Sequence, residues 1–565
     1  MRRMMAKKGS DRMVVVSMQA VVALLCVVAA YIEICDAAAV VDVYRMIQYD
    51  FQGTPFGSRR AVVNHHASSG LSVPGSDLSR TIVILPIDKV NVTLLNEYLQ
   101  SRKMLGGLLL ILPRNFENGG KSSGESDSED SDGDQPADVA ALEQWLIHNN
   151  IPYPVYFAYS DERIDSVLKD VQLNDAAGRP ATASTGGYKL VVPVSDAKKV
   201  PSASYTNIQG WLWGLKGDGD IAGLPTIAIV ASYDTFGAAP ALAVGSDSNG
   251  SGVVALLELA RLFSRLYANS KTRAPYNLLF GLTSGGPFNY NGTARWLRGF
   301  DQRVRENIDY ALCLNSIGDA DNLRMHVSKP PENPFIKQIY DNIADVARDV
   351  GVTVEIKHKK INISNSRVAW EHEQFSRHRI TAATLSGLET APSFLDRVGG
   401  IADRRYSAND TVVARNIKIV AESLAKHIYG LEGKNIEVFA DGSSLAVSPP
   451  YVKLWLDLLS RTPRVAPFLG KNAPIIAAIQ KELAVHTKDV SLQHDNLDGT
   501  FLFYDTIKAQ LSIYQVASVT FDLFIMLAVG SYLGILFLVL VITTKGFDDL
   551  VGAFRRPPSR KLKGN

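Results

Sequence analysis

A buried strand followed by a long buried helix is the feature that most limits how this chain can fold. The apolar run Pro225–Ala231, rich in β-branched residues, is typical of a strand inside a sheet. After a loop, Gly250–Ala268 carries apolar residues on nearly all sides, as expected for a helix packed on a parallel sheet. The same alternation predicts an α/β domain, with further strands at Tyr276–Thr283, Ile308–Ser316 and Arg379–Ser386 and helices at Pro334–Gly351 and Val412–Leu431.

Polar motifs follow the predicted strands. Ser232-Tyr233-Asp234 follows the first strand, Asp247–Gly252 opens the helix, and Ser284–Thr293 follows the second strand. From Pro225 to Gly430 the order and spacing resemble the M28 zinc-peptidase family, which shows H-x-D, D-D-N-x-S-G, a Glu-Glu pair, an Asp and a late His. The resemblance implies a peptidase-like domain at residues 206–434, with a mixed, mostly parallel sheet.

Four positions of the family's two-zinc site carry residues that cannot do its chemistry. By the resemblance, Ser232 replaces the first histidine ligand, and Asn315 replaces a ligand aspartate. Gly286 and Pro287 replace the general base and a glutamate ligand. A neutral hydroxyl or amide binds zinc weakly, and a general base alone contributes about 10²–10⁴ in rate. We therefore expect no catalytic residue, no bound metal and no cofactor.

Three positions keep the family's residue types. Asp234 matches the aspartate that orients the first histidine, Asp247 the bridging carboxylate and His372 the final histidine. Isolated Asp and His residues are more often structural, and we expect that role for Asp247 and His372. An atypical metallohydrolase or aminopeptidase is the alternative, with ligands elsewhere, although the candidates lack the spacing of a metal motif: His65-His66, or His358 with Glu355.

Both ends of the chain carry membrane-targeting patterns. Basic residues, an apolar run and Ala37-Ala38-Ala39 predict a signal peptide at residues 1–39, with retention as a signal anchor as the alternative. Residues 523–544 contain no charge and are long enough to span a bilayer. The basic tail at residues 545–565 should face the cytosol under the positive-inside rule. The sequence therefore predicts a single-pass type I membrane protein whose body lies in a lumen.

Short signals in the tail and body point to the endoplasmic reticulum. Lys561 and Lys563 stand three and five places from the end, as in K-x-K-x-x retrieval signals, although a basic flank of the span would look similar. N-x-S/T sequons predict glycosylation of the lumenal body. They occur at Asn91, Asn249, Asn291, Asn362 and Asn409. Because two of these sequons fall in the motif loops, we expect a glycan there to obstruct any cleft.

The remaining segments are predicted from periodicity and composition. Residues 40–205 alternate strand and helix patterns and should form a small N-terminal α/β domain. Within them, the Gly-, Ser- and acid-rich residues 117–138 are predicted to be a disordered insertion. Residues 435–520 should form a helical stalk, with helices at Tyr451–Ser460, Ile475–His486 and Phe501–Val516.

Motifs outside the zinc-site positions also resemble the nicastrin-related, catalytically degenerate branch of the M28 family. They include Val43–Gly53, the loop at 245–252, Trp370–Glu373 and Phe503-Tyr504-Asp505. The resemblance implies an endoplasmic reticulum membrane scaffold that works with the nodal modulator protein, a small multispanning subunit and the Sec translocon. Such a scaffold supports insertion and assembly of multi-pass membrane proteins and, in vertebrates, modulates Nodal signalling. The net charge of +2 gives no reason to expect nucleic-acid binding.

Overall fold

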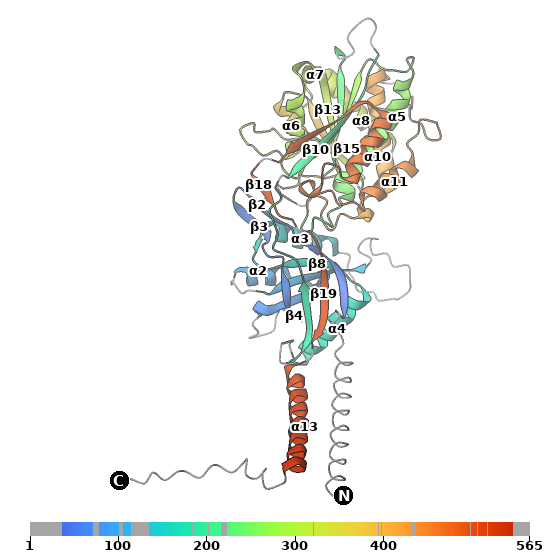
Figure 1. The fold of residues 1–565 in the computed structure, drawn as a ribbon. Coiled ribbons are helices and arrows are strands. Elements are labelled where there is room, and N and C mark those ends of the chain that lie inside the picture. The colour runs from blue at the N-terminus through green and yellow to red at the C-terminus, as the bar shows by residue number, and fades with distance from the viewer. Residues whose placement is uncertain are drawn as a thin grey trace.

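A barrel domain and a sheet domain are stacked above a rod-like helix, α13 (Val519–Lys545) (Figure 1). The computed structural model describes residues 37–545 without 72–77, 101–104, 115–134, 180, 183–184, 202, 216–222, 320, 394, 397, 432–435, 498, 506 and 517. Most of the predicted signal peptide and acidic insertion, and the tail with Lys561 and Lys563, lie outside the described residues.

The barrel domain closes seven strands in the order β1-β19-β9-β4-β5-β6-β8. Alternate side chains fill its interior, where α4 also packs, because successive strand residues face opposite sides. The helices are α2 (Val92–Gln100), α3 (Gln135–His148) and α4 (Glu162–Ala176). The strands are β1 (Ala39–Arg45), β4 (Val63–Ser68), β5 (Thr81–Pro86), β6 (Gly107–Leu112), β8 (Val155–Tyr159), β9 (Gly187–Val192) and β19 (Lys508–Val516).

A four-stranded sheet and a shared apolar core join the two domains. The sheet has the order β18-β2-β3-β7. Tyr49 of β2 and Phe503 of β18 belong to the same buried cluster as Phe236 and Phe288 of the sheet domain. The domains therefore share one core instead of meeting through a linker. These strands are β2 (Gln48–Phe51), β3 (Thr54–Ser58), β7 (Asn150–Ile151) and β18 (Phe501–Phe503).

The sheet domain confirms the predicted α/β fold class with a mixed, mostly parallel sheet. Its eight strands have the order β15-β14-β16-β13-β11-β12-β10-β17. Four neighbouring pairs are parallel, β11–β12, β11–β13, β13–β16 and β14–β15, and three are antiparallel. The strands are β10 (Ser204–Leu212), β11 (Thr226–Ser232), β12 (Asn277–Thr283), β13 (Ile308–Leu314), β14 (Asn322–Val327), β15 (Thr353–His358), β16 (Ala382–Ser386) and β17 (Lys488–Asn496).

Helices cover both faces of this sheet, as is usual for parallel strands in α/β domains. One face packs against α5 (Gly252–Ala268), α8 (Pro334–Asp349), α10 (Asp410–Tyr429), α11 (Pro449–Leu459) and α12 (Pro474–His486). The other packs against α6 (Asn291–Gly299), α7 (Gln302–Asn307) and α9 (His372–Arg377). Local signals set the ends of α10. Asn409 caps its first turn by accepting from Thr411 N, and Gly430 ends it with a left-handed φ of 59°.

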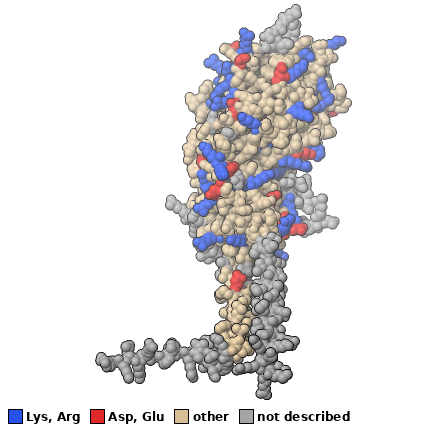
Figure 2. All heavy atoms as spheres, viewed as in Figure 1, with Lys and Arg blue, Asp and Glu red and all other residues tan. Residues whose placement is uncertain are grey.

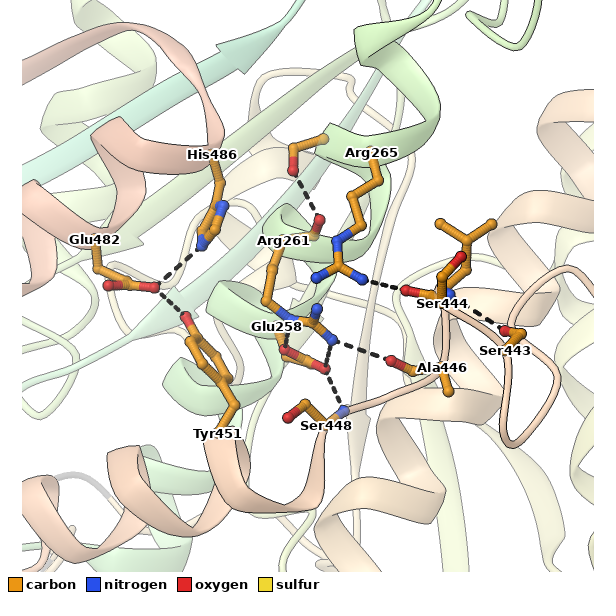
Figure 3. A network of polar contacts seen from close by, with 12 residues as sticks. Glu258, Arg261, Arg265, Ser443, Ser444, Ala446, Ser448, Tyr451, Glu482 and His486 are labelled. Carbon is orange, nitrogen blue, oxygen red and sulfur yellow. Dashed lines mark hydrogen bonds and ion pairs between the residues drawn. The ribbon is translucent and has the colours of Figure 1, made fainter.

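A buried ion pair ties α5 to the following helices (Figure 3). Arg261 donates to both carboxylate oxygens of Glu258, with Nε–Oε2 at 2.6 Å and Nη2–Oε1 at 2.5 Å. Glu258 Oε1 also accepts from Ser448 N, just before α11, at 2.8 Å. The Arg261 guanidinium lies over the Tyr451 ring of α11, whose hydroxyl donates to Glu482 of α12 at 2.7 Å. α11 and α12 are thus integral to the sheet domain.

The predicted helical stalk is partly wrong. The helices expected at Tyr451–Ser460 and Ile475–His486 are present as α11 and α12. In place of the helix expected at Phe501–Val516, the chain forms β18 and β19, and β19 pairs with β1 and β9 inside the barrel. The reason is alternation, because Leu511 and Ile513 both face the barrel core. The segment therefore returns to complete the first domain.

Two predicted segment boundaries also differ from those in the structure. α3 begins at Gln135, inside the stretch predicted to be disordered up to residue 138. The division between residues 205 and 206 falls inside β10, which spans Ser204–Leu212.

Residues 522–544 form a helix with a mean hydropathy of 2.7 that buries none of its apolar window in the protein. That helix is long and apolar enough to cross a bilayer, in agreement with the sequence.

Candidate functional site

Loops at one edge of the eight-stranded sheet enclose a cavity of about 660 Å³. They follow β11, β12, β13 and β16, whose carboxyl ends share that edge because these strands run parallel. The lining residues are mostly small, hydroxylic, amidic or acidic. Beyond the predicted positions they include Ser248, Tyr290, Ser316, Asp319, Thr390, Ser393, Asp396 and Asp403.

The cavity brings together some of the predicted positions and leaves others out. Ser232, Asp247, Gly286 and Asn315 all line it. Asp234 is fully buried. Neither Asp234, Pro287 nor His372 is among the lining residues. The motif alignment thus placed the correct loops around one cavity, but it did not place every motif side chain there.

Asp234 joins two loops through its carboxylate. Oδ1 accepts from Ser232 Oγ at 2.9 Å and Gly286 N at 3.1 Å, while Oδ2 accepts from Gly285 N at 2.7 Å. Asn249 Nδ2 donates to the Asp234 carbonyl. Burial raises the pKa of Asp234 to about 6, although these hydrogen bonds oppose the rise. Its oxygens are therefore occupied in holding the loops together.

Asp247 is held in a similar way. Oδ1 accepts from Gly318 N at 2.6 Å, and Oδ2 accepts from the Ser316 hydroxyl. Asp247 N donates to Asp403 Oδ1 at 2.9 Å, and Asp403 Oδ2 accepts from Ser248 N at 2.9 Å. Burial and then the charge of Asp403 raise the pKa of Asp247 to about 6. The carboxylate expected to bridge two metals is instead bound to the loop after β13.

Glu371 and His372 are buried away from the cavity lining. His372 Nδ1 lies 2.9 Å from Thr384 Oγ1 on β16, and burial lowers the pKa of this imidazole to about 3. Glu371 accepts from Thr283 at 2.6 Å and Thr293 at 2.7 Å, and burial raises its pKa to about 7. The assignment of His372 to the final ligand position of the cavity is therefore not supported. Its neutral side chain is part of the packing between α9 and β16.

The residues present do not fit a pair of zinc ions. Structural and catalytic zinc sites use three or four Cys, His, Asp or Glu ligands. Among the described residues no group of three such side chains is close enough to hold a metal. His65 and His66 lie on β4, in the other domain from β15, which carries Glu355 and His358. Glu355 pairs with Lys357 at 2.8 Å. Neither alternative set belongs to a group of three potential ligands within the described residues.

Two buried residues that the sequence did not single out support the cavity walls. Arg464 donates to the carbonyls of Tyr233 at 2.7 Å and Gly245 at 3.0 Å, and burial lowers its pKa to about 10. Glu143, on α3 of the barrel domain, accepts from Ile401 N in the loop that follows β16. Neither residue belongs to a motif, so no local signal marked it.

Known proteins share this arrangement at the level of fold and sequence. The family model of the nicastrin large lobe matches residues 225–385. BOS complex subunit NCLN of Mus musculus is 36% identical over 544 residues, which cover 91% of each chain. Nicalin of Caenorhabditis elegans is 31% identical over 414 residues, which cover 69% of each. This chain belongs to the nicalin family. The predicted relationship to the nicastrin-related branch is thereby confirmed.

The fold of this nicalin-family chain is shared with nicastrin. A crystal structure of nicastrin, a gamma-secretase component, aligns with 84% of this chain and 99% of that chain, with a TM-score of 0.57 and 11% identity. That level of identity supports a common architecture only. The chemistry of the cavity in this nicalin-family member therefore has to be judged from its own residues.

The predicted glycosylation sites differ in accessibility. Asn249 is only 2% exposed, and its Nδ2, the atom that would carry a glycan, donates to the Asp234 carbonyl. A glycan at Asn249 is incompatible with this structure, which corrects the expectation from the sequon. Asn91, Asn362 and Asn409 are exposed, and Asn291 is partly buried at the start of α6.

Proposed function

We propose that this nicalin-family chain is a non-catalytic scaffold subunit of a membrane complex. The main support is the hydrogen bonding at the cavity, where loop groups engage the carboxylates of Asp234 and Asp247. In addition, Ser232, Gly286 and Asn315 supply no strong zinc ligand. An array of this kind stabilises the loops, and it engages both carboxylates that the zinc-site motif keeps. In a scaffold subunit, the surfaces of the two domains would bind the other subunits of the complex.

The proposed complex is the BOS complex, after which the mouse relative is named. Within it, we expect the chain to work with the nodal modulator protein and a small multispanning subunit beside the Sec translocon. The complex would support insertion and assembly of multi-pass membrane proteins and, in vertebrates, modulate Nodal signalling. The apolar helix α13 supports this proposal because it provides a membrane anchor.

The proposed location is the endoplasmic reticulum membrane, with both folded domains in the lumen and the tail in the cytosol. Lys561 and Lys563 support retrieval to that compartment. A cleaved signal peptide would deliver the domains to the lumen. We propose glycosylation at the accessible sequons Asn91, Asn291, Asn362 and Asn409.

Affinity purification tests the proposed membership. The full chain, carrying a tag after residue 39, is purified from membranes solubilised in mild detergent, and its partners are identified by mass spectrometry. The control is an unrelated type I protein of the same membrane with the same tag. We expect the nodal modulator protein and translocon subunits in the first sample only. Their absence from it would contradict the proposal.

Metal analysis distinguishes the scaffold from a metallohydrolase. We expect the purified chain to contain no stoichiometric zinc and to leave peptide amides intact. Stoichiometric zinc that is lost in Asp247→Ala or His372→Ala, together with amide hydrolysis, would overturn the scaffold function. Asp319→Ala is a matched control, because Asp319 also lines the cavity but occupies no position of the zinc-site motif.

A further inference from the structure

The barrel domain is tied closely to the start of the apolar helix. β19 ends at Val516, whose partner in the sheet is Gly187 at the start of β9. Even a fully extended chain from Val516 to Asp522, where the apolar segment begins, spans only about 20 Å. The real distance is shorter because α13 already begins at Val519 and a helix rises about 1.5 Å per residue. This end of the barrel therefore lies near any bilayer that α13 crosses.

The last turn of α4 lies at the same end of the barrel. Asp175 Oδ2 accepts from Ser68 Oγ at 3.0 Å and from Ser69 N at 2.7 Å, which fixes this turn to the end of β4. β4 pairs with β9, so the end of β4 is close to Gly187. In Figure 1, α4 lies at the lower end of the barrel domain, next to the point where α13 departs.

The side chains exposed on this turn are apolar, amidic or basic, with the amides at Gln172 and Asn174. Leu173 is 61% exposed, and Ala176 and Ala177 are exposed beside it. Arg179 is exposed and forms no ion pair within the described residues. The acidic Asp175 points inward to β4. On the visible face of both domains, acidic and basic side chains are interspersed (Figure 2).

We propose that residues 172–179, which we term the α4 turn, contact the phospholipid interface. This proposal rests on the membrane-spanning role of α13. Leu173 would enter the headgroup region, where apolar side chains gain by leaving water, and Arg179 would face the lipid phosphates. A single spanning helix leaves the folded domains free to tilt. A second contact beside it sets the orientation of the barrel and so the height at which the sheet domain is held.

Site-directed spin labelling tests the contact in the full chain. Leu173→Cys is made in a background with Cys26, Cys35 and Cys313 replaced by Ser, labelled with a nitroxide and reconstituted into vesicles of phosphatidylcholine and phosphatidylserine. Collision with oxygen, which enters lipid, is compared with collision with a water-soluble nickel chelate. The matched control is Ile363→Cys, an equally apolar site that is 74% exposed in the sheet domain. We expect the oxygen-to-nickel ratio to be several-fold higher at position 173.

Two further arms separate the possible failures. Leu533→Cys, within α13, reports whether the helix spans, so a water-like signal there would contradict the anchor itself. A lipid signal at 533 with a nickel-accessible label at 173 would overturn only the α4-turn contact. Replacement of phosphatidylserine by phosphatidylcholine, or Arg179→Glu, should lower the ratio at 173, whereas Lys271→Glu in the sheet domain should not. Protection at 173 that requires an added protein subunit would also overturn the proposal.

Discussion

The hydroxyl of Ser232 donates to Oδ1 of Asp234 at 2.9 Å. In the M28 pattern these two positions hold a zinc-binding histidine and the aspartate that orients it. Here the serine and the aspartate bond to each other. The Asp234 carboxylate also accepts hydrogen bonds from the backbone N–H groups of Gly285 and Gly286. The former ligand position has become part of the hydrogen bonding that fixes two loops. This relationship shows that the cavity loops are held together by hydrogen bonds within the protein.

Gly286→Ala should destabilise the sheet domain. A Cβ at this position would clash with Ser232 Oγ and lie 3.2 Å from Ser232 Cβ. Overpacking of this kind costs about 1–3 kcal/mol, so we expect a lower melting temperature for the detergent-solubilised chain. Gly470→Ala is the control, because a Cβ at that position meets no atom within 4 Å.

A double mutant shows whether that clash is the cause. Removing the Ser232 hydroxyl relieves the closest contact, so Ser232→Ala combined with Gly286→Ala should cost less than the sum of the two single substitutions. Strict additivity of the two effects would show that the lost stability has another origin.

Glu371→Gln should weaken the dependence of stability on pH. Burial raises the pKa of Glu371 from 4.5 to about 7, so the folded state keeps a proton that the unfolded state releases between these values. The free energy of unfolding should then fall by about 1 kcal/mol per pH unit as pH rises through that window. Thermal melts from pH 4.5 to 7 should show a flatter slope for Glu371→Gln. An unchanged slope in that variant, or the same flattening in exposed Glu389→Gln, would contradict the assignment.

Glu143→Ala should loosen the contact between the domains. Glu143 Oε1 accepts from Ala238 N at 2.9 Å and Ile401 N at 3.0 Å, both on the sheet domain. Loss of the acceptor leaves buried N–H groups unpaired, at a cost of about 1–3 kcal/mol. Hydrogen exchange should speed up in residues 398–403 and 236–240. The exposed helix residue Glu162, changed to Ala, should leave both segments unaffected.

Glycan mapping should separate the sequons by burial. Asn409 is exposed at the start of α10, whereas Asn249 is buried with its Nδ2 bonded to the Asp234 carbonyl. We expect mass spectrometry after enzymatic deglycosylation in ¹⁸O-labelled water to find modification at Asn409 and none at Asn249. A glycan at Asn249 in the folded chain would mean that the motif loop adopts a different conformation.

Local patterns predicted the sheet domain well. The strand at Pro225–Ala231 appears as β11 and the helix at Gly250–Ala268 as α5, because uninterrupted apolar runs require burial on both sides. The motif spacing assigned Ser232, Asp247 and Asn315 to one site, and all three line the same cavity. The sequence patterns did not identify hydrogen-bond partners that are far apart along the chain. Asp403 supports the Asp247 loop from 156 residues away, and its own neighbours carry no motif.

The sequence by itself determined which chemistry the cavity lacks. The chemistry of a side chain does not depend on the fold. The hydroxyl of Ser232, the hydrogen of Gly286 and the amide of Asn315 are therefore not strong zinc ligands in any conformation. Only the tertiary structure decided that β19 completes the barrel and that Asp247 is bound by the loop after β13. The physical reason is that strand pairing and buried hydrogen bonds depend on groups brought together from distant parts of the chain, which a local pattern does not encode.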